Sequence, residues 1–583
     1  MKHYTLFLCY SLLINTSLNA QYYEKVYLPF YFQEAEKVLP VNDTTYAVLI
    51  GTRTQGEYHY ESGLLFVDKY GQIIDSVHYQ QDSTNYYSTA LLANEQGFAI
   101  AVAKDLDTHN YSQYHDNMYF VQTDYSGHIL YQNAIGYPGN TNSNDLMSMI
   151  HTPEDGGYLL VGWISLPFGA YYRPYLVKLN ANGEKQWEKI INDYNPNLDS
   201  RLFDVVHTNE GYFAVGSINS NSNTGVGDII LAQIDITNGS FINEWIYNFD
   251  DYYGSSGFDW GRNLLALDDG GFIISGGNQT PPQVGYLLRL DSNKNLVWFN
   301  DSTNYDCGVA QTRYLPTDGS FVTTGCATVL YPEVSNGVQV EISKVSATGA
   351  LLWKRHYGVD GADDYAWDMI NTPDGGFMVV GRSYSFFWQQ TPIYLLKTNC
   401  MGLLTQPQAN FTAQIDTALL TATFQNLSQY TYPDSIDGGH YLWDFGDGAT
   451  SNQINPTHTY AQGGNYTVTL TAVVCSDTSV YTLPISTYAV GINQVLPLEG
   501  GVRGGLCTVL PNPANEQISI NSLKPLSGTF VLYDVLGKEV ARQVLSANNT
   551  GVKTEHLPSG IYLYQIINPQ NQTLQYGKVS ILH

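Results

Sequence analysis

One motif recurs along most of this chain: a tight turn rich in Asp, Asn and Gly, followed at once by an aromatic residue that begins a strand. The copies lie at residues 42–46, 94–98, 153–158, 209–212, 268–272, 318–321 and 373–377. The seven aromatic residues are spaced 49 to 60 residues apart. Self-similarity at such a period is typical of repeat architectures, in which each repeat is one supersecondary unit.

Each repeat predicts four short antiparallel strands. After the aromatic residue comes a strand that we expect to end in Gly in six repeats, then a variable connection, a second apolar strand and another tight turn. These glycines are Gly51, Gly162, Gly216, Gly276, Gly325 and Gly381, and a Trp follows the second turn at Trp187, Trp245, Trp298 and Trp353. We interpret the glycines as permitting positive φ in hairpins and the aromatic residues as filling spaces between units.

Four antiparallel strands per repeat is the size of a propeller blade, and seven blades lie within the known range. We therefore predict a seven-bladed β-propeller. A single blade cannot bury both of its faces, so the blades must stack and the ring must close. The early strand from Tyr22 to Phe32 is a candidate to pair with the last blade.

Composition agrees with an all-β chain and limits the class of partner. The 583 residues include 47 Tyr and 53 Gly, while charged residues make up only 14%. The formal net charge of −27 would repel a phosphate backbone or an anionic membrane, so nucleic acid is not an expected partner. Beyond the N-terminus, no apolar stretch is long enough to predict a membrane helix.

The N-terminus has the order of a secretory signal peptide. Lys2 and His3 precede an apolar stretch at 4–14, and small residues at 17–20 end it. We predict a signal peptide at residues 1–20 and a mature chain that begins near Gln21.

The cysteines that follow the predicted signal peptide lack the spacing of a zinc site. Cys307 and Cys326 flank one predicted strand pair, and a disulfide between them is one pairing that an oxidising compartment allows. Because five cysteines remain after Cys9, at least one stays free or pairs elsewhere.

In a meandering blade, alternate connections leave from opposite ends. The tight turns therefore gather at one end of the propeller, and the long connections gather at the other. The aromatic residues of these long connections that we consider for ligand binding are Phe168, Tyr171, Tyr172, Tyr252, Tyr253, Trp260, Phe387 and Trp388. Aromatic clusters on loops of a rigid scaffold are typical of a glycan or protein binding face. The alternative is that these rings only pack the loops onto the blades.

A second candidate set lies on the innermost strands. Alignment on the glycines places six polar residues at one equivalent position, where we expect them to line the central channel: Thr89, Ser148, Asp204, Asn263, Thr312 and Asp368. The two carboxylates are suitable ligands for a hydrated cation. The competing interpretation is a channel wall in which neighbouring blades hydrogen-bond to each other.

No catalytic motif is present. The 13 His are scattered, and neither HExxH nor GxSxG occurs. We therefore predict no enzyme, no catalytic residue, no metal and no cofactor. A glycosidase needs only two suitably placed carboxylates, so an extracellular polysaccharide-degrading hydrolase remains the alternative.

The pattern changes near residue 406. The sequence WDFGDG at 443–448, the segment 455–460 and the strand 464–470 resemble the PKD-type family of immunoglobulin-like domains. The resemblance covers residues 406–490 and implies a non-catalytic spacer or adhesive module. Asp444 and Asp447 are candidate calcium contacts, but turn formation explains them as well.

The last segment resembles the type A C-terminal sorting domain of the type 9 secretion system of Bacteroidota. The elements that carry this resemblance are PNPA at 511–514, the YDVLGK run at 533–538, LPSGIY at 557–562 and GK at 577–578. The resemblance implies export across the outer membrane by that machinery, followed by surface attachment or release. As a fold, residues 508–583 predict a small β-sandwich.

Together these patterns predict an all-β chain with a seven-bladed β-propeller followed by two immunoglobulin-like β-sandwich domains. The expected boundaries are a signal peptide at 1–20, a propeller at 21–405, a PKD-type domain at 406–490, a linker at 491–507 and a sorting domain at 508–583. The expected function is that of an exported cell-surface or secreted binding or adhesion protein. A purely structural surface-layer component is a further alternative.

Overall fold

The computed structural model contains strands and no helix among the residues that it describes. These are residues 11–13, 22–27, 32–53, 60–79, 85–105, 116–137, 143–165, 171–194, 197–221, 226–249, 259–278, 284–301, 308–329, 337–359, 361–384, 391–431, 440–488, 507–510, 514–522, 526–570 and 572–583. The all-β prediction is confirmed. Residues 1–413, 424–456 and 467–484 form one compact unit, and residues 414–423, 457–466 and 485–583 form another.

Seven antiparallel sheets follow one another along the first part of the chain, and we call them blades 1 to 7. Blade 1 contains β3 (Phe32–Asn42), β4 (Thr45–Arg53), β5 (Tyr60–Asp68) and β6 (Ile73–His78); blade 2 contains β7 (Asn85–Asn94), β8 (Gly97–Asp105), β9 (Asp116–Thr123) and β10 (Ile129–Ala134). Blade 3 contains β11 (Ser143–Thr152), β12 (Gly157–Ser165), β13 (Tyr172–Leu179) and β14 (Lys185–Ile190); blade 4 contains β15 (Asp199–Thr208), β16 (Gly211–Asn221), β17 (Val226–Ile234) and β18 (Phe241–Tyr247).

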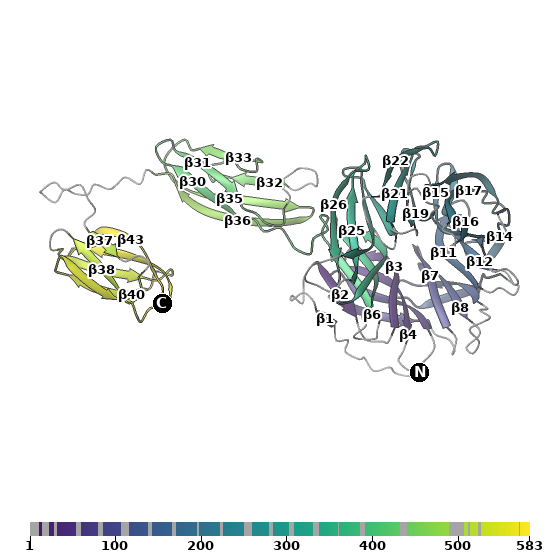
Figure 1. The fold of residues 1–583 in the computed structure, drawn as a ribbon, viewed down its shortest axis with the longest axis horizontal. Helices are drawn as coiled ribbons and strands as arrows, with labels where there is room; N and C mark the ends of the chain where they lie inside the picture. The colour runs from purple at the N-terminus through teal and green to yellow at the C-terminus, as the bar shows by residue number, and fades with distance from the viewer. Residues whose placement is uncertain are drawn as a thin grey trace. The chain divides into compact units, whose positions relative to one another are not determined.

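Blade 5 contains β19 (Asp259–Ala266), β20 (Phe272–Asn278), β21 (Val284–Leu290) and β22 (Leu296–Asn300); blade 6 contains β23 (Val309–Leu315), β24 (Ser320–Val329), β25 (Gly337–Val345) and β26 (Leu351–Tyr357). Blade 7 contains β27 (Asp363–Asn371), β28 (Phe377–Tyr384), β29 (Ile393–Thr398) and two strands from the beginning of the chain, β2 (Tyr23–Tyr27) and β1 (Ser11–Leu13). Figure 1 shows the sheets around a common axis, with β3, β7, β11, β15 and β19 near its centre.

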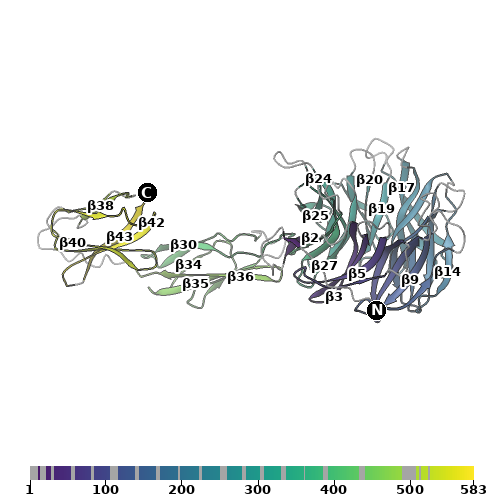
Figure 2. The same cartoon turned by 90° about the horizontal axis from the view of Figure 1, so that it is seen from below.

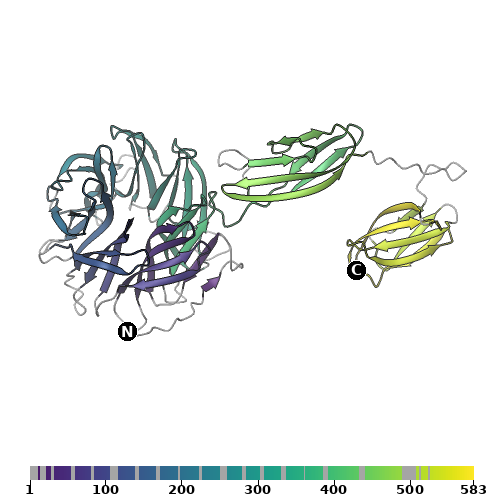
Figure 3. The same cartoon turned by 180° about the vertical axis from the view of Figure 1, so that it is seen from behind.

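The ring closes through the N-terminal strand β2. It pairs antiparallel with β29, with Tyr23 opposite Lys397 and Tyr27 opposite Ile393, so it becomes a strand of the last blade. All five residues of β2 are buried. The innermost strand of blade 1, β3, contacts β27 and β28 of blade 7. The expected pairing of the early strand is therefore confirmed. Figure 3 shows the ring from behind, and Figure 2 shows the propeller edge-on.

The apolar cores lie between neighbouring blades. Phe213 of blade 4 meets Phe272 of blade 5 with ring centroids 4.9 Å apart, and both side chains are buried. Trp187 of blade 3 donates a hydrogen bond from Nε1 to the carbonyl of Ile236 in blade 4, at 3.0 Å. The aromatic residues fill the spaces between blades, as predicted.

Several repeated glycines have a different cause from the one we expected. Gly162, Gly216, Gly276 and Gly381 do not end their strands, and they do not have positive φ. Each lies beside a β-bulge in the innermost strand. A Cβ at Gly216 would lie 1.9 Å from the carbonyl oxygen of Arg201, and a Cβ at Gly381 would lie 1.8 Å from that of Tyr365. These positions require Gly because the neighbouring backbone occupies the place of a side chain.

We predict that Gly216→Ala lowers the free energy of unfolding by about 3 kcal/mol, since the methyl group must displace backbone. Gly51→Ala is the matched control, because the nearest atom to its Cβ, Glu34 Cγ, is 3.7 Å away. The control should be neutral or slightly stabilising. Thermal and denaturant unfolding of both variants measure the difference, and equal stabilities would contradict the bulge explanation.

The PKD segment forms two sheets. One contains β30 (Phe411–Asp416), β31 (Thr421–Asn426) and β34 (Thr457–Thr459); the other contains β33 (Thr450–Ser451), β32 (His440–Asp444), β35 (Asn465–Val474) and β36 (Asp477–Ser486). Trp443 is fully buried, and its ring centroid lies 4.9 Å from that of Phe411. Asp444 Oδ1 accepts a hydrogen bond from Gly446 N at 2.8 Å, and Asp447 Oδ1 accepts one from Ala449 N at 3.0 Å. Both carboxylates therefore stabilise the turn.

The sorting segment also forms two sheets. One contains β37 (Cys507–Leu510), β38 (Gln517–Ser522) and β41 (Asn549–Lys553); the other contains β40 (Glu539–Leu545), β39 (Gly528–Tyr533), β42 (Gly560–Ile567) and β43 (Thr573–Ile581). Phe530 and Ile566 are fully buried in its core. Asp534 Oδ1 accepts hydrogen bonds from Leu536 N and Lys538 N, each at 2.9 Å, which explains the Asp of the YDVLGK run. Most of the predicted linker at 491–507 lies outside the described residues.

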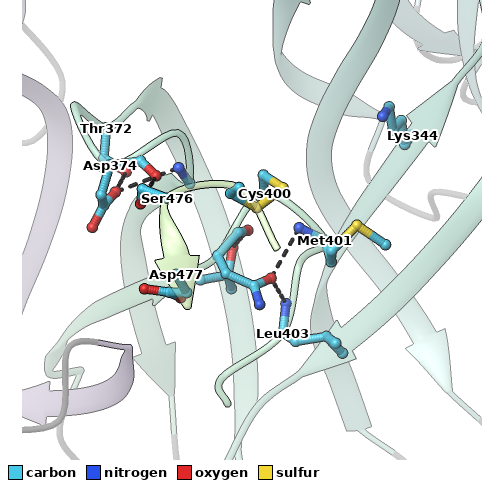
Figure 4. Close-up of a disulfide and its surroundings, with 12 residues drawn as sticks. Lys344, Thr372, Asp374, Cys400, Met401, Leu403, Ser476 and Asp477 are labelled. Atoms are coloured by element: carbon cyan, nitrogen blue, oxygen red, sulfur yellow. Dashed lines mark hydrogen bonds between the residues drawn. A yellow bond between two sulfur atoms is a disulfide. The ribbon is translucent and has the colours of Figure 1, made fainter. Parts of the chain in front are cut away.

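A disulfide that the sequence analysis missed joins the end of blade 7 to the PKD segment. Cys400 follows β29, and Cys475 lies in the turn between β35 and β36 (Figure 4). Beside it, Ser476 Oγ donates a hydrogen bond to the carbonyl of Asp374 at 2.7 Å. Tyr22, next to the closing strand β2, donates one to the Asp477 carboxylate. The hairpin turn is thus attached to the turn of blade 7 and to the start of β2.

The other cysteines have separate outcomes. Cys326 is disulfide-bonded, and no described residue is its partner. The predicted partner Cys307 lies outside the described residues. Cys507 is free and buried.

We predict that the double variant Cys400→Ser with Cys475→Ser is less stable than the unmodified chain. A crosslink that closes a loop of 75 residues stabilises by about 4 kcal/mol in the chain-entropy model. The thermal midpoint under oxidising conditions measures the loss, and Cys507→Ser serves as the control. An unchanged midpoint of the double variant would argue against a stabilising role.

Candidate functional site

The innermost strand of every blade carries a one-residue β-bulge at the same place. The register shifts identify the bulged residues as Glu36, Thr89, Met147, Phe203, Arg262, Ala310 and Trp367. Bulges re-aim side chains and are frequent next to functional sites. This ring therefore provides a common reference for the residues that face the axis of the propeller.

Directly after the bulge, polar side chains link one blade to the next. Ser148 Oγ donates a hydrogen bond to Asp204 Oδ1 at 2.6 Å, and Asn263 Nδ2 donates one to Asp204 Oδ2 at 2.7 Å. Thr312 N donates to Asn263 Oδ1 at 3.0 Å. The series connects blades 3, 4, 5 and 6.

The same belt continues across the closure of the ring. Gln311 Nε2 donates a hydrogen bond to Asp368 Oδ1 at 2.8 Å, and Val38 N donates to Asp368 Oδ2 at 3.0 Å. Blades 6, 7 and 1 are joined in this way. Both oxygens of Asp204 and of Asp368 accept bonds from neighbouring blades, which favours the scaffold interpretation over a cation site.

The register corrects part of the alignment that placed the six channel residues. Ser148, Asp204, Asn263 and Asp368 do occupy one equivalent position, directly after the bulge. Thr89 is itself the bulged residue of blade 2. In blade 6 the equivalent residue is Gln311, and Thr312 lies one residue further along. Alignment on glycines alone did not account for the extra residue of the bulge.

The aromatic residues proposed for ligand binding divide into two groups. Phe168, Tyr252, Tyr253, Phe387 and Trp388 lie outside the described residues. Among the others, Tyr171 is half-buried and immediately precedes β13.

Tyr172 and Trp260 have clear neighbours. The guanidinium carbon of Arg201 lies 4.1 Å from the centroid of the Tyr172 ring. The Trp260 ring packs so closely on Gly277 and Gly308 that a Cβ at either would lie 2.9 or 3.1 Å from it. Trp260 therefore packs against blade backbone, whereas Tyr172 joins a charged cluster.

Six side chains from blades 1, 5 and 7 form what we call the channel cluster: Glu34, Glu36, Arg262, Tyr365, Trp367 and Arg382. The Arg262 guanidinium lies 5.1 Å from the Trp367 ring centroid, although blade 6 separates their two blades in the ring. The intervening bulged residue is Ala310, the smallest of the seven. Arg262 therefore reaches past the inner strand of blade 6 to blade 7.

Trp367 is the centre of the channel cluster. The Tyr365 ring is stacked on it, with centroids 6.1 Å apart and ring planes 11° apart. The Arg382 guanidinium lies 5.4 Å from the Trp367 centroid and 5.1 Å from the Tyr365 centroid. Arg382 Nη1 also lies 3.3 Å from Glu34 Oε2. Two cations, two aromatic rings and a carboxylate thus meet at one point.

Burial shifts three pKa values in this cluster, and it raises that of Tyr365. Burial, together with the charge of Glu34 and a hydrogen bond with it, raises the pKa of Glu36 to about 8, although the charges of Lys37 and Arg262 lower it. Burial lowers the pKa of Arg262, while the charge of Glu36 opposes this. Glu36 therefore holds a proton near neutral pH, as one member of a carboxyl pair.

A second charged and aromatic cluster lies between blades 3 and 4. Arg201 Nη2 is 3.1 Å from Asp199 Oδ2, and its guanidinium lies 5.5 Å from the Trp163 ring centroid. Burial raises the pKa of Asp145 to about 6, although the Arg201 charge and a hydrogen bond from Trp163 lower it. A carboxyl group that titrates near neutrality is suited to proton transfer.

The inner strands contribute residues to both clusters from the halves that lead in from the long connections. Glu34, Asp145, Arg201, Trp260 and Tyr365 each lie two residues before a bulge. These charged residues were not among the candidates predicted from the sequence, which were aromatic residues of the loops and polar residues of the channel. Charged or aromatic residues inside otherwise apolar inner strands, as in GRN at 261–263 and AWD at 366–368, were the available pattern.

Two segments match known family models. Residues 404–482 match the PKD domain, and residues 508–579 match the secretion system C-terminal sorting domain. The chain carries both domains. The sorting domain indicates export by type 9 secretion to the cell surface or the medium. Within the described ranges, no helix has the length and hydropathy that crossing a membrane needs.

The curated relatives share only part of this chain. The pre-pro-metalloprotease PrtV of Vibrio cholerae is 29% identical over 221 residues, which are 35% of this chain and 21% of that protein. The collagenase ColA of Bacillus cereus is 33% identical over 110 residues, which are 16% of this chain and 12% of that protein. This chain thus spans about a fifth or less of the length of either relative.

Solved structures are similar to separate parts of the chain. The PKD1 domain of Vibrio cholerae PrtV is 31% identical and covers 14% of this chain and 99% of its own, with a TM-score of 0.13. The β-propeller domain of the Trilobed protease from Pyrococcus furiosus, described as having an open velcro topology, is 10% identical. It covers 65% of this chain and 96% of its own, with a TM-score of 0.36.

The Glu36 carboxyl predicts a pH dependence of stability. Its pKa is about 8 in the folded chain and near 4.5 when unfolded, so the folded state holds the extra proton between these values. The free energy of unfolding should therefore fall as pH rises from about 5 to 8. In Glu36→Gln, this part of the fall should be absent. Chemical denaturation at pH 5 and pH 8 measures it, and parallel pH profiles would contradict the assignment.

Proposed function

We propose that this chain is an exported surface or secreted recognition protein whose propeller binds a glycan or protein ligand at the end with the long connections. The observation that carries the proposal is the channel cluster, in which Arg262 of blade 5 reaches past blade 6 to Trp367 of blade 7. Inter-blade cores and turn residues explain most aromatic and charged residues of the propeller. They do not explain this convergence of partly exposed residues.

The site has the features of a recognition surface on a rigid scaffold. The hydrogen-bond belt through Asp204 and Asp368 joins the innermost strands just beyond the cluster and limits their movement. Aromatic faces with polar partners suit saccharide rings or protein side chains. The long-connection aromatics, from Phe168 to Trp388, would extend the same surface.

The two C-terminal domains fit this role. A signal peptide at residues 1–20 would take the chain through the inner membrane, and the sorting domain would deliver it to type 9 secretion. The PKD domain would present the propeller as a spacer or adhesive module. The propeller is then the part that is delivered.

A second candidate function is hydrolysis of a polysaccharide. Glu36 and Asp145 have pKa values raised toward neutrality, to about 8 and about 6. Carboxyl groups in these states are suited to act as general acid and base. We rank this candidate second, because both groups are also close to arginines that explain them as binding residues.

We predict that the full chain binds one class of immobilised glycan or surface protein, and that Tyr365→Leu weakens the binding about 3- to 10-fold by removing a ring from the platform. Tyr576→Leu is the matched control, since Tyr576 is 72% exposed in the sorting domain. Array binding followed by calorimetry measures the affinities.

The same samples, assayed for release of reducing ends, test the second candidate. Turnover that is lost in both Glu36→Gln and Asp145→Asn would favour the hydrolase. Binding without turnover favours recognition. Neither binding nor turnover, with self-association of the chain, would instead indicate a structural surface component.

A further inference from the structure

The channel cluster contains more hydrogen-bond donors than acceptors. Trp367 Nε1 and Arg382 Nε are buried, and neither has a hydrogen-bond partner among the residues that the structure describes. For the Arg262 guanidinium, no acceptor is found among the described residues. A buried donor without an acceptor costs about 1 to 3 kcal/mol. A ligand that supplies acceptors at this place would remove that cost.

The acceptors inside the cluster are already engaged. Glu34 pairs with Arg382, and Glu36 is hydrogen-bonded to Glu34. The proton that Glu36 holds near neutral pH removes its charge. The six side chains of the cluster then hold one carboxylate, that of Glu34, and two guanidinium groups, so the cluster has a net positive charge inside a chain whose formal charge is −27. An anion at this place would balance the charge and accept hydrogen bonds from these donors.

The arrangement of the aromatic rings and guanidinium groups further limits the chemical class of the ligand. Tyr365 and Trp367 have nearly parallel planes, and such aromatic faces are suited to the flat face of a pyranose ring. Guanidinium groups beside this platform match a planar carboxylate, which can accept two parallel hydrogen bonds from one arginine. A saccharide that carries a carboxylate satisfies both requirements.

The charge of the whole chain excludes a densely charged ligand. A formal charge of −27 repels a polyanion at long range, so the attraction of the two arginines acts only at short range. The ligand expected here has one acidic unit in an otherwise neutral chain.

We propose that the channel cluster binds a single carboxylate-bearing sugar unit of a largely neutral glycan. The carboxylate lies between Arg262 and Arg382, and the pyranose ring lies against the aromatic pair of Tyr365 and Trp367. This proposal rests on the recognition function above and specifies its ligand class. Uronic acids and sialic acids share the chemistry, and the experiment distinguishes these two sources.

The test compares acidic saccharides with their neutral counterparts on the full chain. One pair is a xylotetraose that carries one glucuronic acid and plain xylotetraose; the other is sialyllactose and lactose. Isothermal titration calorimetry measures each affinity at moderate salt. We expect at least one acidic member to bind at least 10-fold more tightly than its counterpart. Methyl esterification of its carboxylate should abolish that advantage without any change in the protein.

Variants then assign the contact. Arg262→Gln and Arg382→Gln should each weaken binding of the acidic saccharide about 10-fold or more, the range of a lost charge-assisted hydrogen bond. Arg262→Lys keeps the charge and should retain part of the affinity. The control is Arg542→Gln, whose side chain is 50% exposed in the sorting domain. Thermal unfolding identifies any variant that fails to fold, and the esterified ligand gives an answer independent of folding.

The possible failures are distinguishable. Equal affinity for acidic and neutral members overturns the carboxylate proposal, while sensitivity to Tyr365→Leu would still support recognition at this end of the propeller. If the chain binds a protein and no saccharide, and Tyr365→Leu weakens that binding, the carboxylate proposal is overturned and the recognition function is still supported. Absence of any ligand at the channel cluster overturns both the carboxylate proposal and the recognition function.

Discussion

The propeller depends on one long-range pairing, that of β2 with β29. Every blade must bury both faces, and this is possible only when the first and last blades meet. Blade 7 takes the strand that pairs with β29 from Tyr23–Tyr27, and all five of these residues are buried. Loss of this strand would leave the edge of β29 unpaired and expose the outer face of one blade. The closure also fixes the axis on which the inner strands converge, and therefore the place where Glu36, Arg262 and Trp367 meet.

The repeated bulge converts a regular scaffold into an asymmetric site. Each inner strand contributes one extra residue at the same level, and the side chain at that level differs in every blade. Where it is small, as at Ala310, a neighbour such as Arg262 has room to extend. Where it is large, as at Trp367, it provides a platform. Below this level, Asp204 and Asp368 hold adjacent blades together. Along these strands, the bulged residue varies from blade to blade, and the residue directly after it includes the side chains that link neighbouring blades.

The sequence supported the architecture better than the site, for identifiable physical reasons. Turn glycines, aromatic anchors and the period of the repeat are local properties, so the all-β propeller and the early strand that closes it were predictable. The PKD and sorting domains were recognisable from contiguous motifs. The place of Gln311 directly after the bulge could not be predicted, because a bulge shifts the register of a strand by one residue and leaves no mark in the local sequence pattern. Arg262 and Trp367 are 105 residues apart in the sequence, and Cys400 and Cys475 are 75 apart. No local sequence pattern indicates contacts between residues so far apart.

The disulfide between Cys400 and Cys475 changes how the chain would carry a mechanical load. Tension applied from the C-terminal side enters at β36, passes through the sulfur atoms and reaches blade 7 at the end of β29. The segment between the two cysteines, which contains β30 to β35, forms a covalent loop outside that path. Most of the PKD sandwich is therefore shielded from stretching. If the exported protein holds a ligand against flow, the force is borne by one hairpin strand, a covalent bond and the strand that β2 pairs with to close the ring.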